Sequence, residues 1–240
     1  MVSLSPAAQV REHPAFSRFA GEQSPASPVF VTLTGPGGVG KNTIIDEVLN
    51  LLPKDKVFLS VSATTRPPRV GEVDGKSYHF MSKLGFSFRL FLGKLWSIWG
   101  FVEKIRFGDH WYGRPVSPVL NAFKQGQVVL GDMDTNGVRG LQAFFGSHII
   151  RPILILPTGQ TLKEQLGFLA ERMTLRGDKP EAIAKRLAIA EKELIELQAL
   201  QNGPKPLFEM TLRNEDSKTS AHNLVAWLKG LNKIQGNSPL

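Results

Sequence analysis

A glycine-rich segment that ends in a lysine and two polar residues sets the architecture of this 240-residue chain: Gly35-Pro36-Gly37-Gly38-Val39-Gly40-Lys41-Asn42-Thr43. Residues 29–34 before it are composed like a strand, and apolar residues over 44–52 recur with helical spacing. A strand, a glycine-rich turn and a helix start are what a phosphate-cradling loop requires, because backbone N–H groups and the helix N-terminus converge on the anion. Lys41 can reach the outer phosphates, and Asn42 stands where the strict pattern has Ser or Thr.

The composition fits a globular chain with anionic partners. Hydrophobic residues make up 42%, and the absence of cysteine excludes a disulfide scaffold, a cysteine nucleophile and thiolate metal sites. The net charge of +8 suits nucleotides, but also nucleic acid or an anionic membrane. We expect flexible segments over residues 1–28 and 231–240 and a cytoplasmic location, with organellar import through residues 1–28 left open.

Strand-like and helical runs alternate along the chain, which predicts an α/β fold with a mostly parallel sheet flanked by helices. The expected strands after the loop are 57–62, 127–134, 149–156 and 207–212, and the expected helices are 136–145, 161–172, 180–200 and one around 224–228. Residues 64–119 break this rhythm. We therefore expect an inserted lobe over 64–119, a core domain made of 29–63 and 120–230, and a helical lid over about 170–186.

Two arginines flank a pair of prolines in the segment Ser62-Ala63-Thr64-Thr65-Arg66-Pro67-Pro68-Arg69. Prolines favour the polyproline II conformation, which has three residues per turn, so Arg66 and Arg69 would project from the same side. Two preset guanidinium groups make a phosphate clamp, because each can bind two oxygens. A rigid basic loop on the surface is the alternative interpretation.

Asp132 and Asp134 stand at the end of the strand-like run 127–134. Residues i and i+2 of a strand face the same way, and α/β sheets bind ligands at the carboxyl ends of parallel strands. The two carboxylates could hold metal-bound water, orient an arginine or accept hydrogen bonds from a base; a solvated strand end is the alternative.

Three arginines fall in the helical segment that follows. Arg172 and Arg176 share a helix face, Gly177 and Asp178 break the helix, and Arg186 lies in the next one. Such a hairpin could be a mobile lid whose arginines neutralise charge on a transferring phosphoryl group. A helical hairpin with a basic solvent face is the alternative.

Taken together, these motifs resemble the guanylate kinase family, nucleoside monophosphate kinases of the P-loop fold, over residues 29–228. The resemblance implies ATP-dependent phosphorylation of GMP to GDP with Mg²⁺, with GMP and possibly dGMP as acceptors and no nucleic acid as partner. The same resemblance implies where each ligand binds. ATP would bind residues 35–43 and Asn214. The GMP phosphate would bind Arg66, Arg69, Tyr78 and Tyr112, and guanine would bind Ser62, Glu103, Asp134 and the position of Arg114. Asn42 and Asp132 would lie near Mg²⁺. The catalytic residues would be Lys41, Arg66, Asp132, Arg172, Arg176 and Arg186.

The chemistry agrees with this layout. A GMP phosphate oxygen is already anionic, so the protein needs no strong base and must instead align two polyanions and cancel their repulsion. Guanine presents N1–H and N2–H donors, which carboxylates such as Glu103 and Asp134 accept. Adenine has no donors there, and a site built on such hydrogen bonds rejects the wrong base.

Three departures from the family pattern affect the expected activity. The Asn42 amide can still ligate Mg²⁺ or its water, so we expect slower turnover or weaker metal dependence. Arg114 stands where the family carries a small hydroxyl residue; it could donate to guanine O6, and because it is much larger it could instead crowd the pocket or point out of it. Residues 81–102 lack the acidic helix that the family has at this place. The apolar and basic composition of residues 84–101 indicates either a contact with a membrane surface or a partner, or a stretch whose coding sequence has been scrambled or has drifted.

Three further functions are considered at this point. A guanylate-kinase-like module could bind a nucleotide or partner with weakened catalysis. A related P-loop kinase with another acceptor is opposed by the intact segment 62–69 together with Asp134. A nucleic-acid binder is opposed by basic residues that fall in specific sites rather than along one stripe with interleaved aromatic residues.

Overall fold

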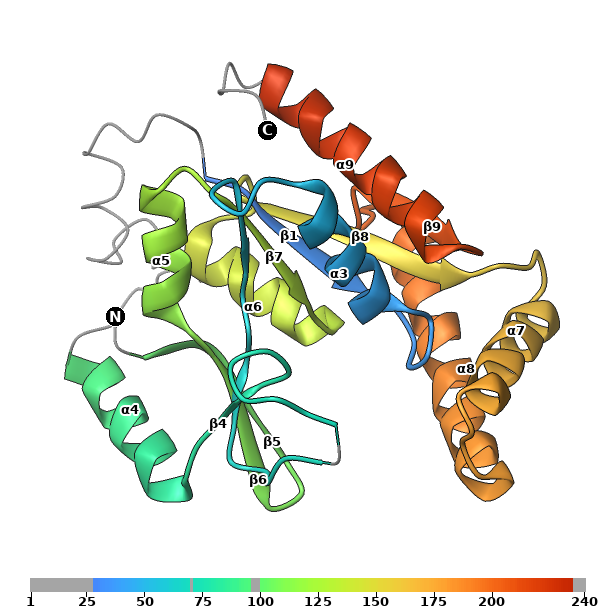
Figure 1. The fold of residues 1–240 in the computed structure, drawn as a ribbon, viewed down its shortest axis with the longest axis horizontal. Coiled ribbons are helices and arrows are strands. Elements are labelled where there is room, and N and C mark those ends of the chain that lie inside the picture. The colour runs from blue at the N-terminus through green and yellow to red at the C-terminus, as the bar shows by residue number, and fades with distance from the viewer. Residues whose placement is uncertain (1–27, 70, 96–99, 235–240) are drawn as a thin grey trace.

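The structure is a computed structural model that describes residues 28–69, 71–95 and 100–234, with the backbone alone of residues 94, 95, 103, 107 and 232–234. A five-stranded sheet forms its centre (Figure 1). The strand order is β2(Val57–Leu59), β7(Val128–Asp132), β1(Phe30–Thr34), β8(Ile150–Pro157), β9(Met210–Asn214), and every neighbouring pair is parallel. The predicted α/β architecture with a mostly parallel sheet flanked by helices is confirmed.

The central strand β1 is buried on both faces, because successive side chains of a strand point to opposite sides. Val31 and Leu33 belong to one hydrophobic cluster, which includes residues of α3(Lys41–Leu51), α7(Leu162–Leu175), α8(Pro180–Asn202) and α9(Ser217–Ile234). Phe30 belongs to a second cluster on the other face, with residues of α5(Val116–Lys124) and α6(Thr135–Phe145).

The register of β1 and β7 brings two functional segments together. Leu33 of β1 pairs with Asp132 of β7, so the glycine-rich loop after Thr34 emerges beside the carboxyl end of β7. This is the edge at which parallel sheets bind ligands.

A second sheet lies beside the first, with the order β4(His79–Phe80), β3(Ala63–Thr64), β6(His110–Pro115), β5(Phe101–Phe107). The helix α4(Lys83–Leu95) lies next to β5 at the lower left of Figure 1. The expected lobe, 64–119, contains most of this sheet. Its last residues belong to the first sheet instead, because α5 starts at Val116, and Val116 and Val119 are buried in the hydrophobic cluster of that sheet.

The ends of several elements differ from the sequence prediction. The strand expected over 57–62 ends at Leu59, because the chain leaves the first sheet and Ala63 pairs with β6 in the second. Residues 231–234, expected in a flexible tail, continue α9, which is anchored by buried Leu224 and Leu228. The expectation of flexible ends falls, for residues 1–27 and 235–240, outside the described residues.

Helix α7 begins at a capping box, in which the Thr161 hydroxyl accepts from the Glu164 N–H and the Glu164 carboxylate accepts from the Thr161 N–H.

Among the residues that the structure describes, no helix combines the length and apolar character needed to cross a bilayer.

Candidate active site

The glycine-rich loop closes tightly over the end of the sheet. Gly40 has φ 98°, which favours glycine, and a Cβ at this residue would lie 2.5 Å from Nδ2 of Asn214. A Cβ at Gly35 would lie 2.2 Å from the carbonyl oxygen of Ile155. Both positions therefore need glycine, and the loop delivers Lys41 at the first residue of α3.

Two side chains from distant elements hold the loop at the carbonyl oxygen of Val39. Asn214 at the end of β9 donates through Nδ2 at 2.7 Å, and Arg172 of α7 donates through Nη1 at 3.2 Å. The Ser220 hydroxyl donates to Oδ1 of Asn214 at 2.9 Å, and Asn214 is fully buried. In this structure Asn214 fixes the phosphate loop, and its contact with adenine stays a prediction.

Lys41 folds back across the loop. Its Nζ donates to the carbonyl oxygens of Gly35 at 2.6 Å and Pro36 at 3.2 Å. Burial lowers the pKa of Lys41 from its ordinary value, while the nearby carboxylates of Asp132 and Glu193 act in the opposite direction. Glu193 also accepts from the backbone N–H of Gly37 at 3.2 Å. A carboxylate of the chain therefore already contacts a loop N–H that a phosphate would use.

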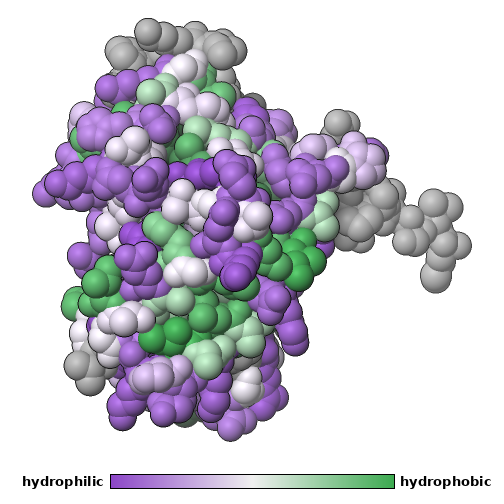
Figure 2. Space-filling model, turned by 90° about the vertical axis from the view of Figure 1, so that its right-hand side faces the viewer, coloured by the Kyte–Doolittle hydropathy of each residue, from purple (hydrophilic) through white to green (hydrophobic). Residues whose placement is uncertain are grey.

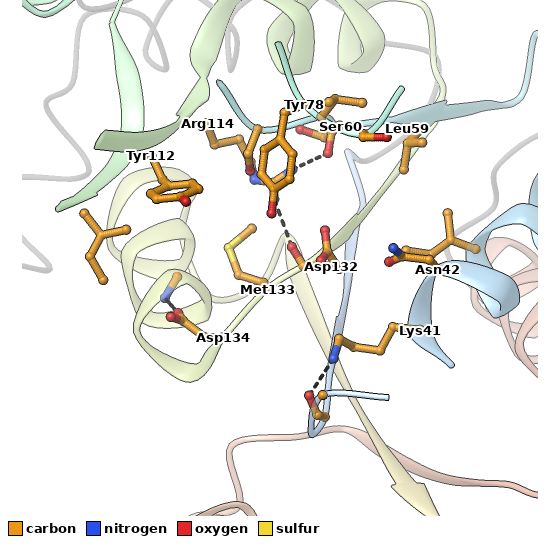
Figure 3. Close-up of a pocket in the computed structure, with 18 of the residues that line it drawn as sticks. Lys41, Asn42, Leu59, Ser60, Tyr78, Tyr112, Arg114, Asp132, Met133 and Asp134 are labelled. Atoms are coloured by element: carbon orange, nitrogen blue, oxygen red, sulfur yellow. Dashed lines mark hydrogen bonds between the residues drawn. The ribbon is translucent and has the colours of Figure 1, made fainter. Parts of the chain in front are cut away.

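Two adjoining cavities open at the carboxyl edge of the sheet. The larger has a volume of about 800 Å³, and the smaller has about 370 Å³. Lys41, Asn42 and Asp132 line both cavities, so these three residues stand where the two meet. Figure 3 shows Lys41, Asn42 and Asp132 facing the larger cavity from α3 and β7.

Most residues predicted to bind GMP line the larger cavity, namely Ser62, Tyr78, Tyr112, Arg114 and Asp134. The rings of Tyr78 and Tyr112 meet edge to face, with centroids 6.0 Å apart (Figure 3). Burial, followed by the neighbouring Asp132 carboxylate, raises the pKa of the Tyr78 phenol. Tyr78 therefore keeps its proton at neutral pH and can donate to an anion.

The carboxylate of Glu72 occupies the arginine clamp. One oxygen accepts from Nη2 of Arg66 at 2.7 Å, and the other accepts from the backbone N–H of Arg69 at 2.6 Å. The hydrogen bond from Arg66, followed by that from Arg69, lowers the pKa of Glu72, and the same contact with Glu72 raises that of Arg66. The Arg66 guanidinium also lies 5.5 Å from the centre of the Tyr78 ring. Arg69 is exposed on the surface.

Two carboxylates were predicted to recognise guanine. Asp134 caps α6, because its Oδ1 accepts from the Gly137 N–H at 2.7 Å, and it lines the larger cavity. The backbone of Glu103 lies in β5, while its side chain lies outside the described residues. The pairing of both carboxylates with guanine stays a prediction.

Arg114 lines the larger cavity and does not point out of it, and its contact with guanine O6 stays a prediction. Its side chain lies at the wall of the cavity with 1% of the residue exposed, and it donates to the backbone carbonyls of Ser60 and, at 2.9 Å, of Asp132. It comes from β6 of the second sheet and reaches the ends of β2 and β7 in the first (Figure 3). Gly131 leaves room for it, since a Cβ there would lie 3.0 Å from Nη1. Arg114 therefore braces the two sheets against each other beneath the site.

The helical hairpin brings the other predicted arginines toward the smaller cavity. Arg172 and Arg176 line it, whereas Arg186 is not among its lining residues. Asp178 in the turn between α7 and α8 pairs with Arg176 and, at 2.5 Å, with Arg186. The hydrogen bond from Arg176, the first of these contacts, lowers the pKa of Asp178.

Three carboxylates in these contacts were not expected to have a role at the site: Glu72, Asp178 and Glu193. The sequence carries a local signal for the first two, because each lies within three residues of an arginine in a turn. Glu193 is 156 residues from Gly37, and no local pattern indicates that contact.

The parallel sheet, the glycine-rich loop on a helix start and the two cavities beside it define a nucleotide-binding protein of the phosphate-loop kinase class. The family model described as guanylate kinase matches residues 28–229. The chain is 38% identical over 207 residues to a guanylate kinase of Synechocystis sp., covering 86% of this chain and 96% of that protein. It is also 38% identical to a guanylate kinase of Trichormus variabilis, covering 87% of this chain and 94% of that protein.

The crystal structure of a guanylate kinase from Anaplasma phagocytophilum has the same fold, with a TM-score of 0.58 at 22% identity over 86% of this chain and 87% of that one. The chain belongs to the guanylate kinase family, as the sequence resemblance indicates.

Replacing the buried brace should destabilise the fold. Arg114→Met keeps much of the side-chain volume but leaves the carbonyls of Ser60 and Asp132 without these donors, so we expect a loss of about 3 kcal/mol in unfolding free energy. Urea unfolding measures it. The matched control Arg139→Met, an exposed position on α6, should change stability by less than about 0.5 kcal/mol. Equal stability of the two variants would contradict the brace.

Proposed function

We propose that this protein transfers the γ-phosphoryl group of ATP to GMP and forms ADP and GDP. The observation that carries the proposal is the meeting of two cavities at Lys41, Asn42 and Asp132. The smaller cavity, on the outer side of the glycine-rich loop, suits the ATP phosphates, and the larger one, under Tyr78 and Tyr112, suits GMP. Family membership supports both assignments.

Phosphoryl transfer needs two polyanions brought into line, and the contacts of the site supply positive groups for both. Lys41 and the loop N–H groups lie on the ATP side, with Arg172 and Arg176 across the smaller cavity. Tyr78 and the adjoining Arg66 lie on the GMP side. The phosphate of GMP is its own nucleophile, so these groups work by positioning and charge neutralisation.

Binding of the phosphates exchanges partners within the protein. ATP displaces Glu193 from the Gly37 N–H and draws Lys41 off the carbonyls of Gly35 and Pro36. The negative charge of the phosphates favours protonated Lys41, which opposes the effect of burial on its pKa. The GMP phosphate takes the place of the Glu72 carboxylate between Arg66 and the Arg69 N–H.

Asn42 and Asp132 fit a magnesium site of the kind in which most ligands are water and substrate phosphate. An amide oxygen and one carboxylate stand at the border of both cavities, and Mg²⁺ commonly binds kinases through one or two protein carboxylates. The bound ion would neutralise charge on the phosphates.

Guanine recognition belongs to the same proposal, with Ser62 and Asp134 on the cavity wall and Glu103 on β5 as acceptors for the base. The proposal also includes that the protein uses dGMP as an acceptor, that it is located in the cytoplasm and that it has no nucleic-acid partner.

A coupled assay of ADP release with ATP, Mg²⁺ and a panel of nucleoside monophosphates tests the proposal. We expect turnover with GMP and none above background with AMP, CMP or UMP, because none of these bases presents the adjacent N1–H and N2–H donors of guanine that Asp134 and Glu103 would accept. Binding of GMP by calorimetry without turnover would show a guanylate-kinase-like binding module instead.

Lys41→Ala should separate transfer from acceptor binding. We expect kcat to fall by about 10²–10³-fold or more, because a fixed cation facing the transferred phosphoryl group is lost. The affinity for GMP, measured without ATP, should stay close to that of the unmodified protein. Lys54→Ala, an exposed lysine beyond α3, serves as the control. Equal loss of GMP binding would contradict two separate subsites.

Asn42→Ser should improve the use of metal. A serine hydroxyl at the second residue of α3 is the ligand that the strict loop pattern supplies, so we expect higher kcat at limiting Mg²⁺ and a lower Mg²⁺ concentration at half-maximal rate. A Mg²⁺ titration of the ADP-release rate measures this. Unchanged or lower rates would contradict the assignment of Asn42 to the metal.

A further inference from the structure

The helix α4 has an inner face that packs against the second sheet. Phe86 is fully buried, and its ring stacks on Phe101 with centroids 4.3 Å apart. Arg89 lies 5.5 Å from the centre of the Phe101 ring and donates to the Ser117 hydroxyl at 3.4 Å. These contacts fix which side of the helix faces the protein.

The outer face carries a stripe of large apolar side chains. Leu84, Phe88 and Phe91 are 84%, 62% and 56% exposed. Their spacing of four and three residues places them one above the other along the helix. A surface helix normally carries polar residues on its solvent side, so a helix that is apolar on both faces indicates a covered surface.

The segment that carries this stripe has charges of one sign. Residues 75–102 contain no Asp or Glu, and α4 itself includes Lys83, which is exposed, and Lys94. Of the other two cations in this range, Arg89 lies on the inner face and Lys76 lines the larger cavity. A second copy of the chain on this face would bring like charges together. An anionic bilayer surface complements both the apolar stripe and the basic residues.

We propose that α4 docks the protein on an anionic membrane surface. The stripe of Leu84, Phe88 and Phe91 lies in the boundary between headgroups and acyl chains, parallel to the membrane, as amphipathic helices with basic residues do. None of the α4 side chains that the structure describes lines either cavity, so docking leaves the nucleotide sites open. In Figure 1 α4 and the lid helices α7 and α8 lie at opposite sides of the molecule.

Co-sedimentation with vesicles tests this, because it does not depend on kinase activity. The full chain should bind vesicles of phosphatidylcholine mixed with phosphatidylserine, bind pure phosphatidylcholine at least about tenfold more weakly, and lose binding as salt rises. The triple variant Leu84→Gln, Phe88→Gln, Phe91→Gln should bind the mixed vesicles at least about tenfold more weakly, since three apolar side chains no longer insert.

A matched control is available on the lid. Leu175, Ile189 and Ile195 of α7 and α8 are 81%, 58% and 55% exposed, close to the three values on α4. Figure 2 shows the side of the molecule on which these helices lie, where apolar residues appear among many polar ones. Replacing these three by Gln should leave vesicle binding unchanged. Equal loss in both triple variants would overturn the proposal, because binding would follow general hydrophobicity.

Two further measurements guard against other outcomes. The α4 triple variant should keep its ADP-release rate with GMP in the absence of vesicles, which shows that the variant is folded. If the triple variant loses that rate, the single variant Phe88→Gln is used in its place. Phe88→Gln must then weaken vesicle binding. Light scattering after size exclusion should give the same mass for both proteins. A dimer that the α4 variant abolishes would assign the stripe to a second copy and overturn the membrane assignment, as would failure of the unmodified chain to bind mixed vesicles.

Discussion

The hydrogen bonds received by the carbonyl oxygen of Val39 hold the site together. Asn214 reaches it from the last strand and Arg172 from α7, so one backbone atom of the glycine-rich loop joins three distant parts of the chain. The loop conformation also depends on it, because Gly40 directly follows and leaves no space for a side chain beside the Asn214 amide. A loop fixed in this way presents its N–H groups to an anion without first having to be ordered.

The site neutralises its cations with its own carboxylates. Glu72 bridges Arg66 and the Arg69 N–H, Asp178 joins Arg176 and Arg186, and Glu193 accepts from Gly37. Cations gathered around one cavity repel one another, and these contacts offset that repulsion. The pairs of Asp178 involve arginines that are 55% and 48% exposed, and such pairs contribute little to stability. The pair of Arg66 and Glu72 is more buried, with side chains 11% and 20% exposed.

The sequence allowed the fold and much of the site to be predicted, because the deciding signals are local. The strand before Gly35, the helix after Lys41 and the Asp132 carboxylate that ends β7 follow from spacing alone. Asp134, expected on the same strand, instead caps α6. Most residues predicted to contact GMP indeed line one cavity. Their roles toward each nucleotide stay predictions.

The missed features depend on long-range geometry. Glu193 meets Gly37 only because α8 packs across the sheet, and Arg114 reaches Ser60 across 54 residues of sequence. Neither contact has a signature in residue spacing. The early end of β2 has the same origin, since pairing of Ala63 with β6 draws the chain out of the first sheet.

Arg114 and Gly131 form a pair of positions that share one space beneath the site. A Cβ at position 131 would lie 3.0 Å from Nη1 of Arg114, so the guanidinium would have to shift by a few tenths of an ångström to accept alanine there. Alanine at position 131 therefore costs more beside arginine at 114 than beside a shorter side chain, and the effects of substituting the two positions do not add.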